Sequence, residues 1–431
     1  MKTIRIRARL LRCLSMSLLF LSLFAVQAMA ETYYVSQLGN DSPNNCNSAK
    51  STTQTNQLLT ISKGVACLSA GDTLYIHGGT YTGPDNVVDS SAFTVNSGTN
   101  WSFGAITIAG YPSETVIIQP PANNAGIGLN TAVEYLIFKD LVIDAVNSSG
   151  NDAQGIYTSD GANHIRFVRI EVKNSSNFGI VFSDSGADGV PTNHEVYDCL
   201  VHDNGSGTAS TNGHGFYITT SGNRIEGCEI YGNLGYGFHI YNETGERDVS
   251  NNVITKNRIH GNGRNTSTAS FGIVLAWGDG NLVSNNLIYN NIYGGIQVYT
   301  GSTNAMIYNN TVYGNGVRSI VMQHYDGPPS IKNNIVWNNG DDINNLGQGT
   351  PVCSNNVTLE TDDDLDCDSG RVTADPSFVN AAANDFQIKL ISSARNAGLA
   401  LTEVPDDFEG VTRPRGASYD IGAYEWHLGP P

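Results

Sequence analysis

Residues 195–204 read EVYDCLVHDN, and the same pattern returns at residues 224–233 as RIEGCEIYGN. It returns four more times, and every copy ends on an asparagine: Asn204, Asn233, Asn262, Asn291, Asn315 and Asn339. Successive anchors are 29, 29, 29, 24 and 24 residues apart. A fixed period in this range is typical of a solenoid. The repeat predicts an all-β protein, a right-handed parallel β-helix that spans residues 71–345.

A second column stands five residues before each anchor: Cys199, Cys228, Asn257, Asn286, Asn310 and Asn334. Stacked amides at a bend can hydrogen-bond from coil to coil and satisfy backbone groups that the bend leaves unpaired. We therefore predict an asparagine ladder that begins with two stacked cysteines. These cysteines either bridge adjacent coils or stay as buried thiols, and both arrangements agree with the usual burial of cysteine.

Each repeat also carries a short strand introduced by a glycine, at residues 179–182, 215–218, 237–240, 272–275 and 295–298. Alternation with a period of two predicts an inward column of Phe216, Phe238, Ile273 and Ile296 and an outward column of Tyr217, His239, Val274 and Gln297. Neighbouring coils lie about 4.8 Å apart. Outward side chains that are distant in sequence are therefore expected to touch.

Both ends of such a helix need a cap, because an open edge pairs with other strands. We predict an N-terminal cap at residues 31–70, with helical spacing from Leu58 to Ser69, and a C-terminal capping region at residues 346–431. The acidic loop at 362–366 is either a solvated turn or, through its hard oxygen ligands, a calcium site.

Residues 1–30 have the pattern of a secretory signal peptide, with five basic residues before an apolar run from Leu18 to Val26. The run is too short to span a membrane. We expect a secreted monomer, periplasmic or extracellular, without a membrane anchor. Cleavage would remove five positive charges and change the net charge from −17 to −22, which disfavours nucleic acid as a partner.

Six cysteines follow the predicted signal peptide, an even number that suits disulfides in an oxidising compartment. Two pairs lie close in sequence, Cys46 with Cys67 and Cys353 with Cys367. We predict that both pairs form disulfides that staple loops near the two ends of the helix.

The two ends of the chain resemble a known family. Residues 33–41 (YYVSQLGND), 71–73 (GDT) and 78–81 (GGTY) resemble the N-terminal cap of secreted bacterial β-helix proteins, including the family 9 pectate lyases. Residues 420–425 (DIGAYE) resemble the tail of many secreted β-helix proteins. The resemblance implies the fold over most of the mature chain and leaves the function open.

The catalytic residues of family 9 polysaccharide lyases are not kept. Aligned through residues 213–239, the family's calcium-binding aspartates fall at His214, Gly235, Tyr236 and His239, and its catalytic lysine falls at Val274. Imidazoles are poor calcium ligands, and valine cannot remove a proton. We therefore reject calcium-dependent pectate lysis and expect no cofactor and no metal at this groove.

The outward face carries another set of reactive side chains: His214, Tyr217, His239, Tyr241 and, in the loop that follows, Arg247. A neutral imidazole accepts a proton, a tyrosine hydroxyl passes one on, and an arginine pairs with a uronate carboxylate. This set predicts metal-independent β-elimination on an extended acidic polysaccharide. The alternative is that these are ordinary outward residues of a long sheet.

Later coils extend the same face with Trp277, Gln297, Tyr299, Gln323 and His324. Aromatic faces stack on sugar rings and amides bond to hydroxyl groups, so these five residues are predicted to bind substrate.

Two other functions compete with a lyase. A non-catalytic solenoid would bind glycans or adhere to them without cleavage. A glycoside hydrolase needs two facing carboxylates, and the candidates are Asp184, Asp188, Glu243, Glu246, Asp248 and Asp279. A zinc site at His214 and His239 has no recognisable third ligand.

Overall fold

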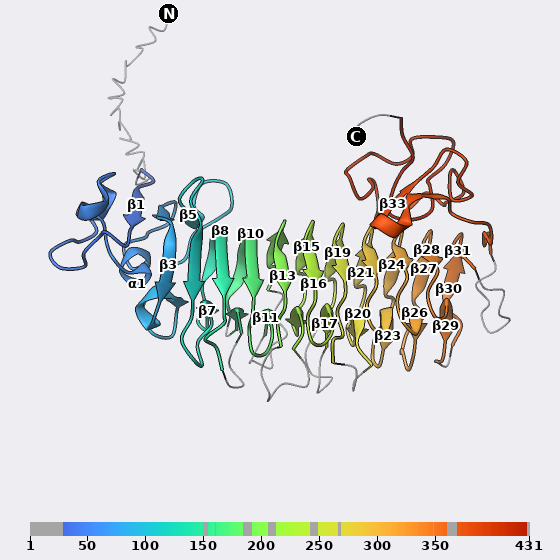
Figure 1. Cartoon of the computed structure of the whole chain (residues 1–431), viewed down its shortest axis with the longest axis horizontal. Helices are drawn as coiled ribbons and strands as arrows, with labels where there is room; N and C mark the ends of the chain where they lie inside the picture. The colour runs from blue at the N-terminus through green and yellow to red at the C-terminus, as the bar shows by residue number, and fades with distance from the viewer. Residues whose placement is uncertain are drawn as a thin grey trace, which may run out of the picture.

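The computed structural model describes residues 29–149, 154–159, 161–183, 192–205, 213–241, 249–265, 269–347, 349–359 and 369–428. Its strands wind into one long coil whose successive turns stack side by side (Figure 1). All strand pairs of the coil are parallel, so the predicted all-β parallel β-helix is confirmed. Most turns of the coil contribute to three faces.

Two of these faces form sheet A, because β8 (Glu134–Asp144) and β10 (Asn163–Lys173) run through both of them. The first face consists of β1 (Thr32–Val35), β2 (Thr73–Ile76), β5 (Ile106–Gly110), β8, β10, β12 (Glu195–Tyr197), β15 (Arg224–Glu226), β18 (Val253–Thr255), β21 (Leu282–Ser284), β24 (Met306–Tyr308), β27 (Ser330–Lys332) and β30 (Val352–Ser354). The second face consists of β3 (Gly79–Thr82), β6 (Val116–Gln119), β8, β10, β13 (Leu200–His202), β16 (Glu229–Tyr231), β19 (Arg258–His260), β22 (Leu287–Tyr289), β25 (Thr311–Tyr313), β28 (Ile335–Trp337) and β31 (Val357–Thr358).

The third face is sheet B, along the lower side of Figure 1. It consists of β4 (Val88–Asp89), β7 (Ile127–Leu129), β9 (Ile156–Thr158), β11 (Ile180–Phe182), β14 (Phe216–Ile218), β17 (Phe238–Ile240), β20 (Phe271–Ala276), β23 (Gly294–Tyr299), β26 (Arg318–Met322) and β29 (Ile343–Asn345). The five glycine-introduced strands of the repeat are β11, β14, β17, β20 and β23, so their prediction is confirmed.

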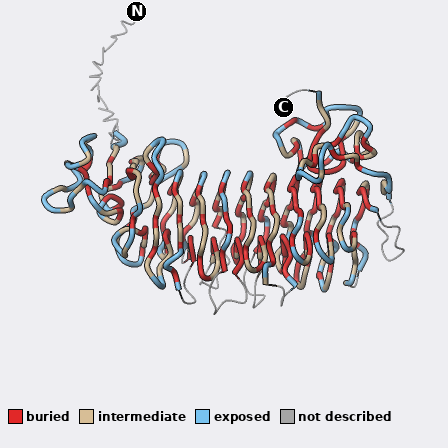
Figure 2. Tube along the Cα trace, viewed as in Figure 1, coloured by how far each residue is buried: buried red, intermediate tan, exposed pale blue. Residues whose placement is uncertain are grey.

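The interior is a continuous apolar column. Buried residues, red in the tube of Figure 2, recur in every turn of the coil. The predicted inward residues Phe216, Phe238, Ile273 and Ile296 are fully buried. Phe216 stacks on Phe238 with ring centroids 4.7 Å apart. Each such side chain stabilises the fold by about 1.5–3 kcal/mol through burial.

Amide ladders close the corners between faces: the ladder at Asn257 and Asn286 is confirmed, and the anchor asparagines form another one that was not predicted. Each buried side chain donates from its Nδ2 to the Oδ1 of the next, for example Asn262 to Asn291 at 3.0 Å and Asn257 to Asn286 at 3.1 Å. At the start of one ladder, the backbone N–H of Cys199 donates to Cys228 Sγ at 3.3 Å. Both cysteines are free and buried, which decides the alternative in favour of thiols.

A third ladder was missed in the sequence. Asn223 donates to Asn252 at 2.8 Å, and Asn252 donates to Asn281 at 3.1 Å, at the corner between sheet B and the first face of sheet A. Its members are also 29 residues apart. The ladder has three members and follows the loop that leads from sheet B to the next strand of sheet A. This loop varies in length from coil to coil, so the ladder does not stand out in the repeat.

The N-terminal cap is built around α1 (Ile61–Val65), with short 3-10 turns at η1 (Ser48–Lys50), η2 (Gln54–Asn56) and η3 (Pro84–Asn86). Ile61 and Val65 are fully buried, so α1 covers the open end of the apolar column. The predicted helix of residues 58–69 is shorter than expected. At Gly64 a Cβ would lie 2.6 Å from a methyl group of Val35, so the close approach of α1 to the first coil requires glycine.

The β-helix extends past its expected boundaries, residues 71 and 345, at both ends. β1, within the expected cap, pairs with β2, and β30 and β31 continue both faces of sheet A to Thr358. Val372 then pairs with Val357, and residues 378–426 lie against the outer side of sheet A, where β32 (Phe378–Asn380), η4 (Ala381–Ala383) and β33 (Asp385–Ile388) are found.

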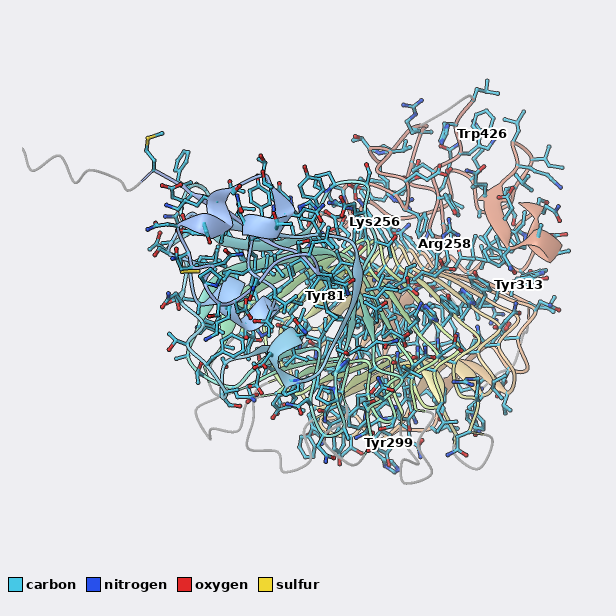
Figure 3. The ribbon with its side chains drawn as sticks, turned by 60° about the vertical axis from the view of Figure 1, so that its left-hand side comes forward. Tyr81, Lys256, Arg258, Tyr299, Tyr313 and Trp426 are labelled. Carbon is cyan, nitrogen blue, oxygen red and sulfur yellow. A yellow bond between two sulfur atoms is a disulfide. The ribbon has the colours of Figure 1, made fainter. Side chains whose placement is uncertain are left out.

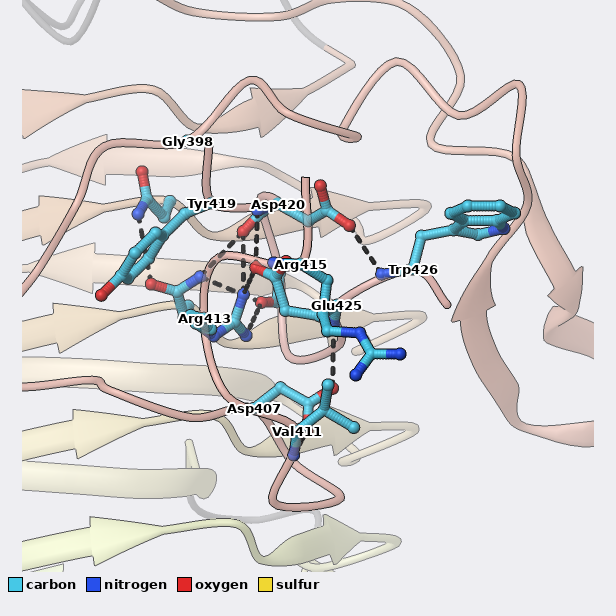
Figure 4. A network of polar contacts seen from close by, with 12 residues as sticks. Gly398, Asp407, Val411, Arg413, Arg415, Tyr419, Asp420, Glu425 and Trp426 are labelled. Atoms are coloured by element: carbon cyan, nitrogen blue, oxygen red, sulfur yellow. Dashed lines mark hydrogen bonds and ion pairs between the residues drawn. The ribbon is translucent and has the colours of Figure 1, made fainter. Parts of the chain in front are cut away.

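A buried polar network holds this C-terminal segment on the helix (Figure 4). Arg413 Nη1 lies 2.7 Å from Glu425 Oε1, and both side chains are inaccessible to solvent. Arg413 Nη2 also donates to Asn285 Oδ1, at a corner of the helix, at 3.1 Å. Removal of either charged partner would leave the other buried and unpaired, which is strongly destabilising.

The disulfide between Cys46 and Cys67 is confirmed. Cys353 is also disulfide-bonded, while its predicted partner Cys367 lies outside the described residues. The predicted signal peptide, apart from Met29 and Ala30, and the acidic loop at 362–366 lie outside them too. In the described part of the chain, no helix has the length and apolar character needed to cross a membrane.

Candidate functional site

Sheet B presents an outward column in which the residue changes from coil to coil. The strand register aligns Asp89, Gly128, Tyr157, Val181, Tyr217, His239, Val274, Gln297, Val321 and Asn344. The predicted neighbours Tyr217 and His239 are thus on adjacent strands, β14 and β17. Their ring centroids are 5.3 Å apart.

Aromatic rings from the segments that flank β14 and β17 converge on His239. The ring centroids of His214, Tyr236 and Tyr241 lie 4.8, 4.9 and 4.8 Å from that of His239. Phe178 stacks on Tyr217 at 5.0 Å and on His214 at 5.2 Å. The structure therefore brings together four of the five predicted catalytic residues. The fifth, Arg247, lies outside the described residues.

His214 lies beneath the other rings and is only 2% exposed. Its Nδ1 accepts a hydrogen bond from the backbone N–H of Tyr236 at 3.0 Å. Burial and the neighbouring His239 hold the pKa of His214 well below its ordinary value. The imidazole is therefore neutral with its proton on Nε2, so His214 can orient a neighbouring group but is poorly placed to take a proton from a substrate.

His239 is half-buried. Its Nδ1 is inaccessible to solvent and has no hydrogen-bond partner among the described residues. Desolvation lowers the pKa of His239 to about 3, so the ring is neutral at neutral pH. Nε2 is the ring nitrogen that can face a substrate. A nearby anionic group, such as a uronate carboxylate, would raise the pKa of the imidazole and strengthen it as a base.

The donor set around His239 does not fit calcium. Calcium requires six to eight oxygen ligands, with carboxylates foremost, whereas the positions aligned with the family's aspartates carry two imidazoles, a phenol and a glycine. Among the described residues there is no group of three or more His, Cys, Asp or Glu that could hold a metal ion.

The five predicted binding residues lie together on β23 and on the turns that follow β20 and β26. Gln297 Nε2 donates to Gln323 Oε1 at 3.4 Å, and the rings of Tyr299 and His324 lie 6.1 Å apart. Trp277 packs over the turn at Gly301, where a Cβ would lie 2.1 Å from the indole. Tyr299 lies on the lower side of Figure 3, away from Lys256, Arg258 and Trp426.

Between these groups the outer surface of sheet B is apolar. Val274 is outward-facing as predicted, yet it is only 2% exposed, because it packs in an external cluster with Phe271, Ala276 and Val321. Tyr236, Tyr241, Trp277, Tyr293 and Tyr299 pack against that cluster. The aromatic side chains thus form a continuous strip of ring surface, which suits stacking on sugar rings.

Only one of the six candidate hydrolase carboxylates lies in the described part of the chain. Asp279 Oδ1 accepts hydrogen bonds from Thr303 Oγ1 at 3.0 Å and Asn304 Nδ2 at 2.7 Å, so it closes a corner of the helix. Asp184, Asp188, Glu243, Glu246 and Asp248 lie outside the described residues.

Phe178, Tyr236, Phe271 and Tyr293 were missed in the sequence. Three of them align with His214 on neighbouring coils, because Phe178, His214, Tyr236 and Phe271 each stand two residues before an inward residue of sheet B. The repeat already contained this signal. These residues form a second outward column beside the one that contains Tyr217 and His239.

Comparisons with known proteins agree with the fold. Pectate lyase Pel9A is 18% identical, with a TM-score of 0.63, over 93% of this chain and 97% of its own. A glycoside hydrolase is 10% identical, with a TM-score of 0.50, over 74% and 96%. An alginate lyase from Paenibacillus is 20% identical, with a TM-score of 0.48, over 67% and 95%.

These identities establish the fold alone. No curated protein sequence matches the chain significantly. Residues 33–345 match the family model described as the Pel9A-like, right-handed β-helix region, which confirms the handedness and the predicted resemblance. The chain belongs to this Pel9A-like family of right-handed β-helix proteins.

Proposed function

We propose that the protein is a secreted polysaccharide lyase that cleaves an extended, uronate-containing glycan by metal-independent β-elimination on sheet B. The observation that carries the proposal is the cluster around the neutral imidazole of His239: a second neutral imidazole and three phenols have ring centroids within 5.3 Å of its own. The names of the similar pectate and alginate lyases support a uronate-containing substrate.

In this mechanism His239 Nε2 removes the proton from the carbon next to the uronate carboxyl group. The bond from the adjacent carbon to the glycosidic oxygen breaks, a carbon–carbon double bond forms, and the departing oxygen takes a proton from Tyr217. Each of the two proton transfers contributes about 10²–10⁴-fold to the rate. His214 and Tyr241 hold the His239 ring from two sides, and Arg247 is proposed to pair with the uronate carboxylate.

Secretion follows the predicted signal peptide, and the Cys46–Cys67 disulfide supports an oxidising compartment. The outer aromatic strip, with Trp277 and Tyr299, would hold further units of the glycan along the helix axis.

The test is a panel of pectin, alginate, glucuronan and a glycosaminoglycan, incubated with the mature protein in a metal chelator. Elimination gives ultraviolet absorbance of an unsaturated product together with new reducing ends. Reducing ends without absorbance would establish hydrolysis instead. Retention on an immobilised glycan without any cleavage would establish a non-catalytic binding solenoid.

A further inference from the structure

A hollow lies on sheet B, toward the N-terminal cap and away from the His239 cluster. It has a volume of about 490 Å³ and is lined by Asp89, Asn124, Gly128, Asn130, Tyr157 and Ser159, among others. This volume lies within the usual range of small-molecule sites, about 300–1,000 Å³.

The hollow exists because the outward column contains a glycine between two larger residues. Asp89, Gly128 and Tyr157 are register partners on β4, β7 and β9. Gly128 has no positive φ, and a Cβ there would meet no atom closer than 3.9 Å. Neither backbone conformation nor packing requires glycine at this position, so its effect on the structure is the open space above the strand.

The walls of the hollow carry hydroxyl, amide and carboxylate groups. Asp89 Oδ1 accepts hydrogen bonds from the backbone N–H and the Oγ of Ser91, at 2.9 and 2.6 Å, whereas Oδ2 has no hydrogen-bond partner among the described residues. Asn130 Oδ1 accepts from Ser159 Oγ at 3.4 Å, so its amide nitrogen still has donor capacity. None of the described lining residues is basic.

This chemistry suits a sugar unit with hydroxyl groups and no charge. Hydroxyls can donate to Asp89 and accept from Asn130, and the half-buried ring of Tyr157 offers a face for stacking. A uronate carboxylate would instead be repelled by Asp89 and would find no cation. Asp89 therefore gives the hollow a preference that is opposite to that of an acidic-glycan site.

We infer that this hollow is a distal subsite for a neutral sugar unit of the same glycan chain that the His239 site would cleave. From Tyr157 on β9, whose ring would stack on the neutral sugar, to His239 on β17 there are three coil steps, or about 14 Å. A pyranose unit of an extended glycan advances by close to one coil spacing, so the neutral unit would lie about three units from the scissile bond. The preferred glycan then contains both neutral and acidic sugars. This inference rests on the proposed function.

Affinity electrophoresis tests the subsite without any requirement for cleavage. Gels contain either polygalacturonate, in which every unit is acidic, or a glycan that alternates galacturonate with rhamnose. Wild type should be retarded more strongly by the alternating glycan. Gly128→Val fills the hollow and should weaken that binding at least tenfold, while Asp89→Asn should strengthen retardation by polygalacturonate.

Thr82→Val, an exposed strand position on sheet A, is the matched control and should bind as wild type does, and thermal unfolding should be alike for all variants. The inference is overturned if Gly128→Val binds the alternating glycan as strongly as wild type, or if wild type is not retarded by it. A parallel ultraviolet assay separates the two proposals. If the protein cleaves the glycan but Gly128→Val does not change binding, only the subsite is excluded. If Gly128→Val weakens binding but no cleavage is seen, only the lyase activity is excluded.

Discussion

The corner ladders and the outward column of sheet B are built on the same coils but follow opposite rules. The ladders repeat one side chain, and each amide bonds the next at 2.8–3.1 Å. The outward column changes residue at almost every coil and includes a carboxylate, a glycine, phenols and an imidazole. The repeated amides satisfy buried polar groups at the corners, and every coil has such groups. Variation along an outer face has no such structural cause, and this is the face on which we propose that the protein acts.

The ladder should be the part of the molecule that is most sensitive to truncation. The side chain of Asn262 makes four hydrogen bonds, with Ile230 O, Asn291 Oδ1 and the backbone and side-chain nitrogens of Asn233. Asn262→Ala leaves these buried partners unpaired, and we expect a loss of about 4 kcal/mol in the free energy of unfolding. Urea unfolding measures it. Asn56→Ala, at an exposed site, should change it by less than about 0.5 kcal/mol.

The outward column should show the reverse pattern, with large effects on activity and small ones on stability. Tyr217→Phe removes the proposed proton donor and keeps the ring, and we expect kcat to fall about 100-fold while the protein stays folded. Tyr231→Phe, on the outer side of sheet A, is the matched control. Equal kcat values for both variants would exclude Tyr217 as the acid.

The pH dependence of kcat/KM separates His239 from an ordinary histidine. Its folded-state pKa of about 3 lies below the usual value, so the ring stays neutral as pH falls from 7 to 5. We expect no acid limb from His239 in this range, whereas a base with a pKa near 6.5 would lose about 30-fold by pH 5. An acid limb centred near pH 6.5 would contradict the assigned environment.

The two cysteines offer the smallest and most local test of the ladder. Cys228 occupies an amide position, where its Sγ lies 3.9 Å from Val196 O while Asn257 reaches the equivalent Ile225 O at 3.0 Å. Cys228→Asn should therefore complete the ladder and raise the free energy of unfolding by about 1 kcal/mol. Cys228→Ser, which cannot reach across, should lower it. Destabilisation by both variants would show that the thiol is the better fit.

The regular part of the molecule could be predicted from the sequence because each coil repeats the same requirements. Spacing between asparagines predicted the ladder that contains Asn257 and Asn286, and alternation predicted the register that pairs Tyr217 with His239. The length of α1 and the docking of residues 378–426 through Arg413 could not be predicted, since they depend on contacts made once, between segments distant in sequence. The burial of His214 and Val274 has the same origin, because neighbouring rings cover them.

The most direct test of a catalytic outer face is the ultraviolet progress curve of wild type and His239→Ala on the best glycan of the panel, in excess chelator. We expect wild type to form unsaturated product at a rate that the chelator does not change, and His239→Ala to be at least about 100-fold slower with an unchanged thermal midpoint. Equal rates for the two proteins, or a wild-type rate that vanishes with the chelator, would contradict metal-independent elimination by His239.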